Sequence, residues 1–384
     1  MNTCMMNPTH LWKWLPVLAF CSTAALAEET LQQQLESRKA EFATKAPQEV
    51  QTAYAAGIQA VSDSGILSAA KKAGDKAPDF TLQDAKGQSV ALHELLKNGP
   101  VVLTWYRGGW CPYCNLSLRA MQKVLPELQE GGAQLVALTP ELPDKTLSTA
   151  EKNELQFQVL TDLNHQVAQS YGIVFKLTPE VRDQYKKNFD LLAYNGSGAG
   201  DDTLPLAATY IIGQDGIIRY AFLDADYRAR AEPAELVVFV KQLLPQKGDH
   251  PSVALLKEFW LRVWNPPHDL TAVDELLTDD FVITNPSGDI VGKAAFKEWL
   301  GGFHKKLGHS RLMPFETFAN ADGTRVVSRW QASGINHGML GTPDDGKPVS
   351  FSGIAIWEVR DGKLSHNWVE RSAWELYQTL TDKP

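Results

Sequence analysis

Alternating strand and helix patterns over residues 75–245 constrain the fold of this 384-residue chain more than any other feature. Residues 101–106 form a continuous apolar run, which is typical of a strand buried on both faces. Residues 112–130 follow a helical pattern, and residues 134–138 form the next apolar run. Short hairpins are predicted before and after this unit. The alternation predicts an α/β domain with a mixed sheet and helices on both faces.

A second domain is predicted over residues 252–384, after a linker at residues 246–251. Helical patterns come first in this domain, and long alternating strands follow them. The expected strands lie at residues 311–319, 324–335, 348–359 and 363–371. Seven of the eleven tryptophans fall in this part of the chain. Helices followed by a run of strands predict an α+β domain whose bent sheet wraps around its helices.

Residues 1–27 have the features of a signal peptide. They contain one charged residue, Lys13, and an apolar stretch that ends in Ala25-Leu26-Ala27. This stretch is shorter than the ~20 residues that span a bilayer, and its small final residues are typical of a cleavage site. We therefore expect cleavage near Ala27 and export to the periplasm or the cell exterior. Residues 28–74 lack strand patterns, and we expect them to form a helical lead-in to the α/β domain.

The charge of the chain excludes one class of partner. It has 37 basic and 45 acidic residues, which give a net charge of −8. Its lysines and arginines form no long basic block. Proteins that bind nucleic acid carry such blocks or a strongly basic face. We therefore expect no nucleic-acid partner.

Cys111 and Cys114 are the residues most suited to chemistry. A glycine pair turns the chain after the predicted strand, and Pro112 stands at the first helical position, where its missing N–H costs nothing. Cys111 would therefore lie at the positive end of a helix dipole, which lowers a thiol pKa from about 8.5 towards ~3.5–7.5. Cys114 follows one turn later on the same face. This order predicts Cys111 as the attacking thiolate and Cys114 as the resolving thiol of a redox-active disulfide.

The cysteine pair has three other interpretations. A zinc site needs two further ligands at matching spacing, and the sequence has no second Cys-x-x-Cys and no His-x-x-x-His. A static disulfide and a pair of buried, inert thiols remain alternatives. The position between a strand and a helix, with proline between the cysteines, favours redox chemistry over both. We expect no metal and no cofactor.

With these cysteines, the chain resembles the peroxiredoxin-like branch of the alkyl hydroperoxide reductase/thiol-specific antioxidant superfamily, which has the thioredoxin fold. The similar stretches are Gly74–Phe80, Tyr106–Cys114 and Thr209–Gly216. The resemblance implies an antioxidant oxidoreductase that acts on peroxides. The Cys111 thiolate would attack the O–O bond, and the sulfenic acid would condense with Cys114. A thioredoxin- or glutaredoxin-like dithiol donor would then reduce the disulfide.

Two positions depart from the pattern of ordinary peroxiredoxins. Those proteins place Thr or Ser three residues before the peroxidatic cysteine, where this chain has Gly108. They also place an arginine just before a later strand, where this chain has Ala207. Arg107 is our candidate for the positive charge of the site. Because Cys-Pro-Tyr-Cys is also the glutaredoxin active-site sequence, thiol–disulfide exchange on protein thiols is an alternative function.

The second domain resembles the SnoaL-like polyketide cyclase family, a cone-shaped α+β fold that encloses an apolar pocket. The similar stretches are Arg329–Gly334, Gly338–Gly341, Pro348–Gly353 and Asp361–Glu370. The resemblance implies a small apolar ligand, for which the candidate pocket residues are Trp330, His337, Trp368 and Glu370. The acid of the family's enzymes aligns with Ser372, so a ligand-binding or dimerising module is favoured over a cyclase. A third function is therefore a small-molecule-binding protein whose thiol pair senses or protects, and a homodimer stays open.

Overall fold

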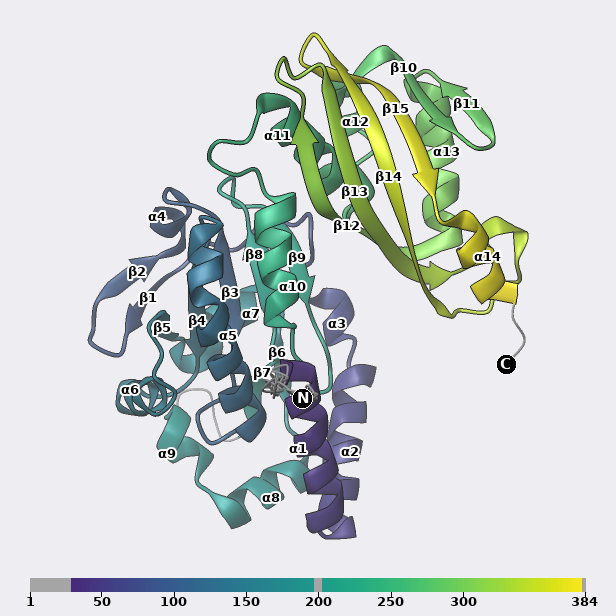
Figure 1. Ribbon diagram of the computed structural model, residues 1–384. Helices are drawn as coiled ribbons and strands as arrows, with labels where there is room; N and C mark the ends of the chain where they lie inside the picture. The colour runs from purple at the N-terminus through teal and green to yellow at the C-terminus, as the bar shows by residue number, and fades with distance from the viewer. Residues whose placement is uncertain (1–28, 197–201, 382–384) are drawn as a thin grey trace, which may run out of the picture.

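The computed structural model describes residues 29–196 and 202–381, and the predicted signal peptide at residues 1–27 lies outside these ranges. The described chain forms two bodies, each built on one large sheet (Figure 1). In Figure 1 the C-terminal body, in green and yellow, lies above the N-terminal body, in purple to teal. Within the described ranges, no helix has both the length and the apolar character needed to cross a membrane.

The N-terminal domain is built on a seven-stranded sheet with the order β2-β1-β5-β4-β3-β8-β9. Its strands are β1 (Thr81–Asp84), β2 (Ser89–Ala91), β3 (Val101–Trp105), β4 (Gln134–Thr139), β5 (Gln158–Thr161), β8 (Thr209–Ile212) and β9 (Ile218–Phe222). β3, β4 and β5 are parallel, and the other neighbours are antiparallel. This is the mixed sheet that the sequence predicts. A separate two-stranded ribbon joins β6 (Val174–Lys176) to β7 (Thr203–Pro205).

Helices cover both faces of this sheet. They are α1 (Leu31–Lys45), α2 (Gln48–Asp63), α3 (Ile66–Ala69), α4 (Leu92–Leu96), α5 (Pro112–Glu130), α6 (Pro143–Lys152), α7 (Gln166–Ser170), α8 (Pro179–Asn188), α9 (Leu191–Asn195) and α10 (Pro233–Val238). A 3₁₀ turn, η1 (Leu163–His165), precedes α7, and a π-helical turn, η2 (Phe239–Leu243), continues α10. Val102 of β3 faces the core under α5 and α10, whereas Leu103 and Trp105 face the core under α4 and α7. β3 is therefore buried along its whole length, and it ends at the loop that carries the cysteines.

The predicted lead-in forms α1 and α2, which are separated at Pro47. α1 begins with a capping box, in which the Thr30 side chain accepts from the Gln33 N–H and the Gln33 side chain accepts from the Thr30 N–H. α1 packs against α5, and α2 packs against α8. The lead-in is therefore part of the wall around the N-terminal domain rather than a free extension.

The C-terminal domain is built on a six-stranded sheet with the order β11-β10-β15-β14-β13-β12. Its strands are β10 (Leu277–Asn285), β11 (Gly288–Val291), β12 (Leu307–Ala319), β13 (Arg325–Asn336), β14 (Pro348–Arg360) and β15 (Lys363–Arg371). Its helices are α11 (Pro251–Phe259), its π-helical continuation η3 (Trp260–Trp264), α12 (Ala272–Leu276), α13 (Lys293–Lys306), the 3₁₀ turn η4 (Met339–Gly341) and α14 (Ala373–Thr381). Figure 1 shows α11, α12 and α13 on one face of the long strands, which confirms the predicted α+β arrangement.

Three elements of this domain are missing from the sequence prediction: β10, β11 and α14. Asp279 and Asp280 stand in the first half of β10, and aspartate is rare in strands. β10 is a strand because it pairs in parallel with β15, which follows it by about eighty residues in the chain. Tertiary pairing therefore overrides a weak local preference here.

The linker is held between the two domains. The Lys257 ammonium in α11 is buried and lies 2.7 Å from an Asp249 carboxylate oxygen. It also donates to the backbone carbonyls of Lys241 and Leu244 at the end of the N-terminal domain. Since η2 of the N-terminal domain also packs against β12, the two domains meet at a defined interface.

Candidate active site

The loop between β3 and α5 places both cysteines at the start of a helix. Cys111 is the residue before α5, and Pro112 is the first helical residue, as predicted. Gly108 and Gly109 are required by the surroundings, because a Cβ at Gly108 would clash with the Trp110 ring and one at Gly109 with the Thr149 side chain. This explains why a threonine cannot stand at position 108 in this loop.

Both cysteines are free thiols, and both are buried. Cys111 is 1% exposed and Cys114 is 0% exposed. The two side chains are hydrogen-bonded to each other. One thiol can therefore donate to the other when the second becomes a thiolate.

Positive and hydrogen-bonding groups converge on the sulfur of Cys114. Arg230 Nη2 lies 3.2 Å from the Cys114 Sγ atom, and the backbone N–H of Arg107 also donates to this sulfur. Burial opposes ionisation, but the Cys111 hydrogen bond and the charges of Arg230 and Arg107 outweigh it and hold the pKa of Cys114 well below its usual value. The positive and hydrogen-bonding groups around this sulfur therefore favour a thiolate at Cys114.

The expected low pKa of Cys111 is wrong in this structure. Burial in the loop, followed by the hydrogen bond and the negative charge of Cys114, raises the pKa of the Cys111 thiol well above its usual value. The helix start does not reverse this, because desolvation of a thiolate can outweigh a helix dipole at a fully buried site.

Arg107, which the sequence analysis proposes as the positive charge of the site, is buried beside the two cysteines. Its guanidinium does not donate a hydrogen bond to either sulfur. Its guanidinium lies over three aromatic rings, at 5.1 Å from the centre of Trp110, 5.8 Å from Tyr185 and 4.3 Å from Tyr227. It also donates to the Tyr185 hydroxyl. No carboxylate in the described residues pairs with Arg107, so its charge lowers the pKa of both cysteines.

A small cavity opens beside Arg107. It has a volume of about 20 Å³ and is lined by Tyr54, Tyr185 and Tyr227 together with residues of α2 and α8. A cavity of this size holds about one water molecule. The space next to the arginine therefore suits only a very small molecule.

Glu141, at the end of β4, anchors the loop from the neighbouring strand. Its carboxylate accepts from the Tyr106 hydroxyl at 2.9 Å and from the Gly109 N–H at 2.8 Å, and Thr149 donates to it at 3.1 Å. Burial raises the pKa of Glu141 above its usual value. The carboxylate holds the glycine turn against the end of β4, which fixes the start of α5.

Neither Arg230 nor Glu141 was among the predicted site residues. Glu141 carries a usable signal, since it lies two residues after the buried strand β4, whose carboxyl end lies beside that of β3, where sites of α/β domains form. Arg230 carries no local signal. It lies in a loop 116 residues after Cys114, and only the folded chain brings it to the sulfur.

The four predicted pocket residues of the C-terminal domain do not meet. Trp330 is buried in the core on the inner face of the sheet. Trp368 and Glu370 lie on the outer face of β15, because the buried Val369 takes the inner position between them. His337 lies in an exposed turn and is hydrogen-bonded to a neighbouring aspartate. The two-residue period of a strand thus separates the candidates.

A different set of residues lines a cavity of about 580 Å³ in this domain, among them Trp299, Phe303, Met339, Phe351 and Arg371. The Arg371 guanidinium lies 5.5 Å from the Trp299 ring centre and 6.0 Å from that of Phe303. No ion pair to Arg371 occurs within the described part of the chain, and burial lowers the pKa of Arg371 to about 10. The cavity therefore combines aromatic walls with two cations, Arg371 and Lys306, and two carboxylates, Asp289 and Glu298.

No group of three or more histidine, cysteine, aspartate or glutamate side chains in residues 29–196 and 202–381 is arranged to hold a metal ion.

Comparison with known proteins agrees with this architecture. Residues 73–221 match the AhpC/TSA family, and residues 258–367 match the SnoaL-like domain. Peroxiredoxin Bcp of Escherichia coli (strain K12) is 31% identical over 102 residues, which cover 27% of this chain and 65% of that protein. Thiol-disulfide oxidoreductase ResA of Halalkalibacterium halodurans is 31% identical over 103 residues, which cover 27% of this chain and 57% of that protein.

A solved structure, peroxidoxin BcpB of Mycobacterium tuberculosis, is 21% identical, with a TM-score of 0.36, and covers 46% of this chain and 99% of its own. The chain spans less than two thirds of the length of the two curated relatives. The two family matches follow each other along the chain without overlap and coincide with the two sheets. The N-terminal domain therefore belongs to the AhpC/TSA family, and the C-terminal domain is a SnoaL-like domain.

Proposed function

We propose that the N-terminal domain is a thiol peroxidase that reduces small hydroperoxides with the Cys111–Cys114 pair. The observation that carries this proposal is the set of donors around one buried sulfur: Arg230 at 3.2 Å, the Arg107 N–H and the Cys111 thiol all stabilise a thiolate at Cys114. The thiolate is the form of cysteine that attacks peroxides. The similarity to peroxiredoxin Bcp supports the same activity.

The attacking residue in this proposal is Cys114, and Cys111 resolves. The Cys114 thiolate attacks one oxygen of R–O–O–H, the O–O bond breaks, and Cys114 becomes a sulfenic acid. The leaving alkoxide takes up one proton and departs as R–OH. The Cys111 thiol then condenses with the sulfenic acid, which forms the disulfide and releases water. A dithiol donor of the thioredoxin or glutaredoxin kind reduces the disulfide and is itself oxidised to a disulfide. This step requires the sulfurs to become exposed after the disulfide has formed, because both are buried in the thiol form.

Burial of the pair favours a small substrate. Cys111 and Cys114 are 1% and 0% exposed, so a protein disulfide cannot contact either sulfur in this conformation. The cavity of about 20 Å³ beside Arg107 admits only a very small molecule and no protein side chain. Arg107 and Arg230 are placed to stabilise the negative charge that develops on the leaving oxygen.

Thiol–disulfide exchange is the second candidate for this site. The Cys-Pro-Tyr-Cys sequence and the similarity to thiol-disulfide oxidoreductase ResA favour it. Exchange with a protein requires an exposed attacking sulfur, so this function needs an open conformation of the loop or of the lead-in helices.

Two serine variants and two substrates separate these functions. With hydrogen peroxide, Cys114→Ser should abolish consumption, whereas Cys111→Ser should keep one turnover and accumulate a sulfenic acid at Cys114, detected by mass spectrometry. With insulin as a protein disulfide, the wild type should show little reduction. Full peroxide turnover in Cys114→Ser, or insulin reduction faster than peroxide consumption, would contradict the peroxidase assignment.

For the C-terminal domain we propose ligand binding in the cavity of about 580 Å³ rather than catalysis. Its aromatic walls and the unpaired Arg371 suit an apolar molecule with an acidic group. Native mass spectrometry of the purified chain should detect such a molecule in the wild type and less of it in Arg371→Gln. Equal occupancy in both proteins would argue against the role of Arg371.

We also propose that the chain is exported and loses residues 1–27. The single charge at Lys13, the apolar stretch and the Ala25-Leu26-Ala27 ending support cleavage at this place. N-terminal sequencing of the protein from the periplasm should begin at Glu28. Recovery of the uncleaved chain from the cytoplasm would contradict export.

A further inference from the structure

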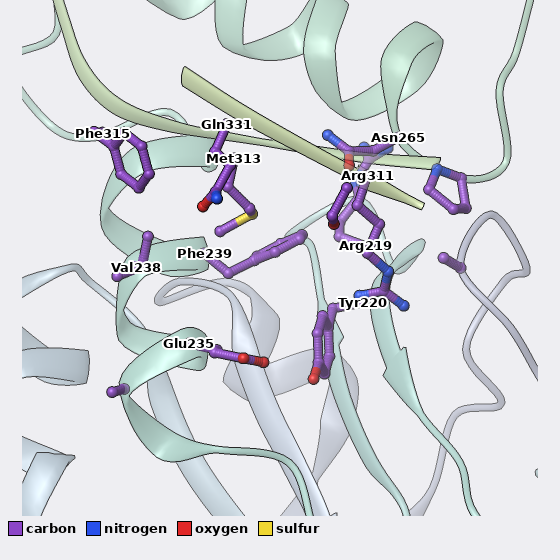
Figure 2. Close-up of a pocket in the computed structure, with 14 residues that line it drawn as sticks. Arg219, Tyr220, Glu235, Val238, Phe239, Asn265, Arg311, Met313, Phe315 and Gln331 are labelled. Atoms are coloured by element: carbon purple, nitrogen blue, oxygen red, sulfur yellow. The ribbon is translucent and has the colours of Figure 1, made fainter. Parts of the chain in front are cut away.

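A cavity of about 380 Å³ lies between the two domains (Figure 2). Tyr220 and Phe239 line it from the N-terminal domain, and Met313 and Gln331 line it from the second sheet. Its volume is within the range of pockets that hold small organic ligands, and such pockets are common at domain interfaces. Because each domain supplies part of the wall, neither domain has this site by itself.

This cavity is separate from the cysteine site. Tyr220 in β9 is paired with Ile211 in β8, which is paired with Val102 near the start of β3. The cysteines follow the opposite end of β3. The cavity and the thiols thus lie at opposite ends of the same strand, and the peroxidase proposal does not use this space.

The walls of the cavity leave apolar surface uncovered. Val238 and Phe315 line it from opposite domains and are 36% and 45% exposed. Phe239 is buried and lies between α10 and the second sheet in Figure 2. Transfer of an apolar group from water onto this surface is favourable. The cavity therefore suits a ligand with an apolar body.

Arg311 gives the cavity a positive side. Its guanidinium lies 5.2 Å from the centre of the Tyr220 ring, and no carboxylate in the described residues pairs with it. Arg219 also lines the cavity, but it is paired with Asp215 at 2.5 Å. Glu235 lies on the α10 side of the cavity rather than on the strand that carries Arg311. Arg311 is thus the cation that is available to a ligand.

We propose that the interdomain cavity binds an amphipathic anion, such as a medium-chain carboxylate. The acid group pairs with Arg311, and the apolar body lies against Phe239, Met313 and Phe315. An arginine binds a carboxylate through two parallel hydrogen bonds, which selects acids over amines of the same length. Such a ligand contacts both domains at once and therefore stabilises their arrangement by mass action.

The test is calorimetric titration of the full chain with decanoate and with decylamine. Decanoate should bind, and decylamine should bind more weakly. Arg311→Gln should weaken decanoate binding by about tenfold or more, since it removes a charge-assisted pair. Ser333→Trp, at an exposed position that lines the cavity, should weaken it by filling the space.

Arg325→Gln is the matched control, because it removes another arginine of the same sheet that lies over an aromatic ring, outside this cavity. It should leave the decanoate affinity unchanged. Arg371→Gln reports on the separate cavity of the C-terminal domain, for which an acidic apolar ligand is also proposed. The proposal is overturned if Arg311→Gln and Ser333→Trp bind decanoate as tightly as the wild type, if decylamine binds as tightly as decanoate, or if only Arg371→Gln weakens decanoate binding. Peroxide consumption stays unchanged in Arg311→Gln, and circular dichroism verifies that each variant is folded.

Discussion

Replacement of Arg230 by glutamine tests the assignment of the thiolate to Cys114. Arg230 Nη2 lies 3.2 Å from the sulfur at a buried site. A hydrogen bond to a charged group contributes about 1.5–3 kcal/mol, and one pKa unit corresponds to about 1.36 kcal/mol. Arg230→Gln should therefore raise the pKa of Cys114 by about one to two units. Below the wild-type pKa, each unit lowers the thiolate fraction about tenfold, so peroxide consumption in that range should fall by about 10- to 100-fold.

The assay reads the Cys114 peptide alone. The protein is alkylated with iodoacetamide at graded pH in a Cys111→Ser background, and mass spectrometry quantifies the labelled peptide. The midpoint of labelling should move to higher pH in Arg230→Gln, and the pH profile of peroxide consumption should move with it. Arg228→Gln is the matched control, because Arg228 lies in the same loop but pairs with Asp226. An unchanged midpoint in Arg230→Gln, or an equal shift in Arg228→Gln, would refute the reasoning.

Three further predictions concern the scaffold. Glu141→Gln should lower the free energy of unfolding by about 1–3 kcal/mol, because an amide cannot accept all three hydrogen bonds of the buried carboxylate. An unchanged midpoint of unfolding in urea would refute this prediction. Burial and the neighbouring His268 lower the pKa of His304 from 6.5 to about 4. The unfolded chain therefore takes up a proton before the folded chain does, and the free energy of unfolding falls as pH drops from about 6.5 to about 4. His304→Asn should flatten this part of the urea-measured profile, and an unchanged slope would contradict the role of His304. Phe296→Ala removes a buried ring whose centre lies 5.1 Å from the centre of the Phe281 ring. The free energy of unfolding, measured by urea denaturation, should fall by about 3–5 kcal/mol. A loss below about 1 kcal/mol would count against tight packing around this ring.

Most of the scaffold was predictable because its signals are local. The continuous apolar run of β3, the proline at the first position of α5 and the alternation in β13 each depend on neighbours within a few residues. β10 was not predictable in the same way, since its aspartates disfavour a strand and only the pairing with β15 stabilises it. Local sequence patterns therefore determine most helices and strands. Where the local pattern is weak, as in β10, the strand it pairs with decides the secondary structure.

At the cysteine site, too, local features were predictable from the sequence and long-range contacts were not. Sequence alone identified Cys111 and Cys114 as a pair at a helix start, and this placement is confirmed. It predicted the charge on Cys111, whereas burial of both thiols and Arg230, which reaches Cys114 from 116 residues away, favour the charge on Cys114. Desolvation and charge act through space, so a helix dipole inferred from the chain order could not rank the two pKa values.

For the pockets, the sequence determined less. It indicated an aromatic-rich, strand-rich second domain, but the side chains of a strand alternate between faces, and a one-residue difference separates Val369 inside from Glu370 outside. Only the folded chain places Arg371 over Trp299 and Arg311 over Tyr220. A cavity is the space left after elements far apart in the chain have packed. Tertiary packing therefore determines which side chains line each cavity. The helices and strands that carry those side chains are largely determined by local sequence patterns.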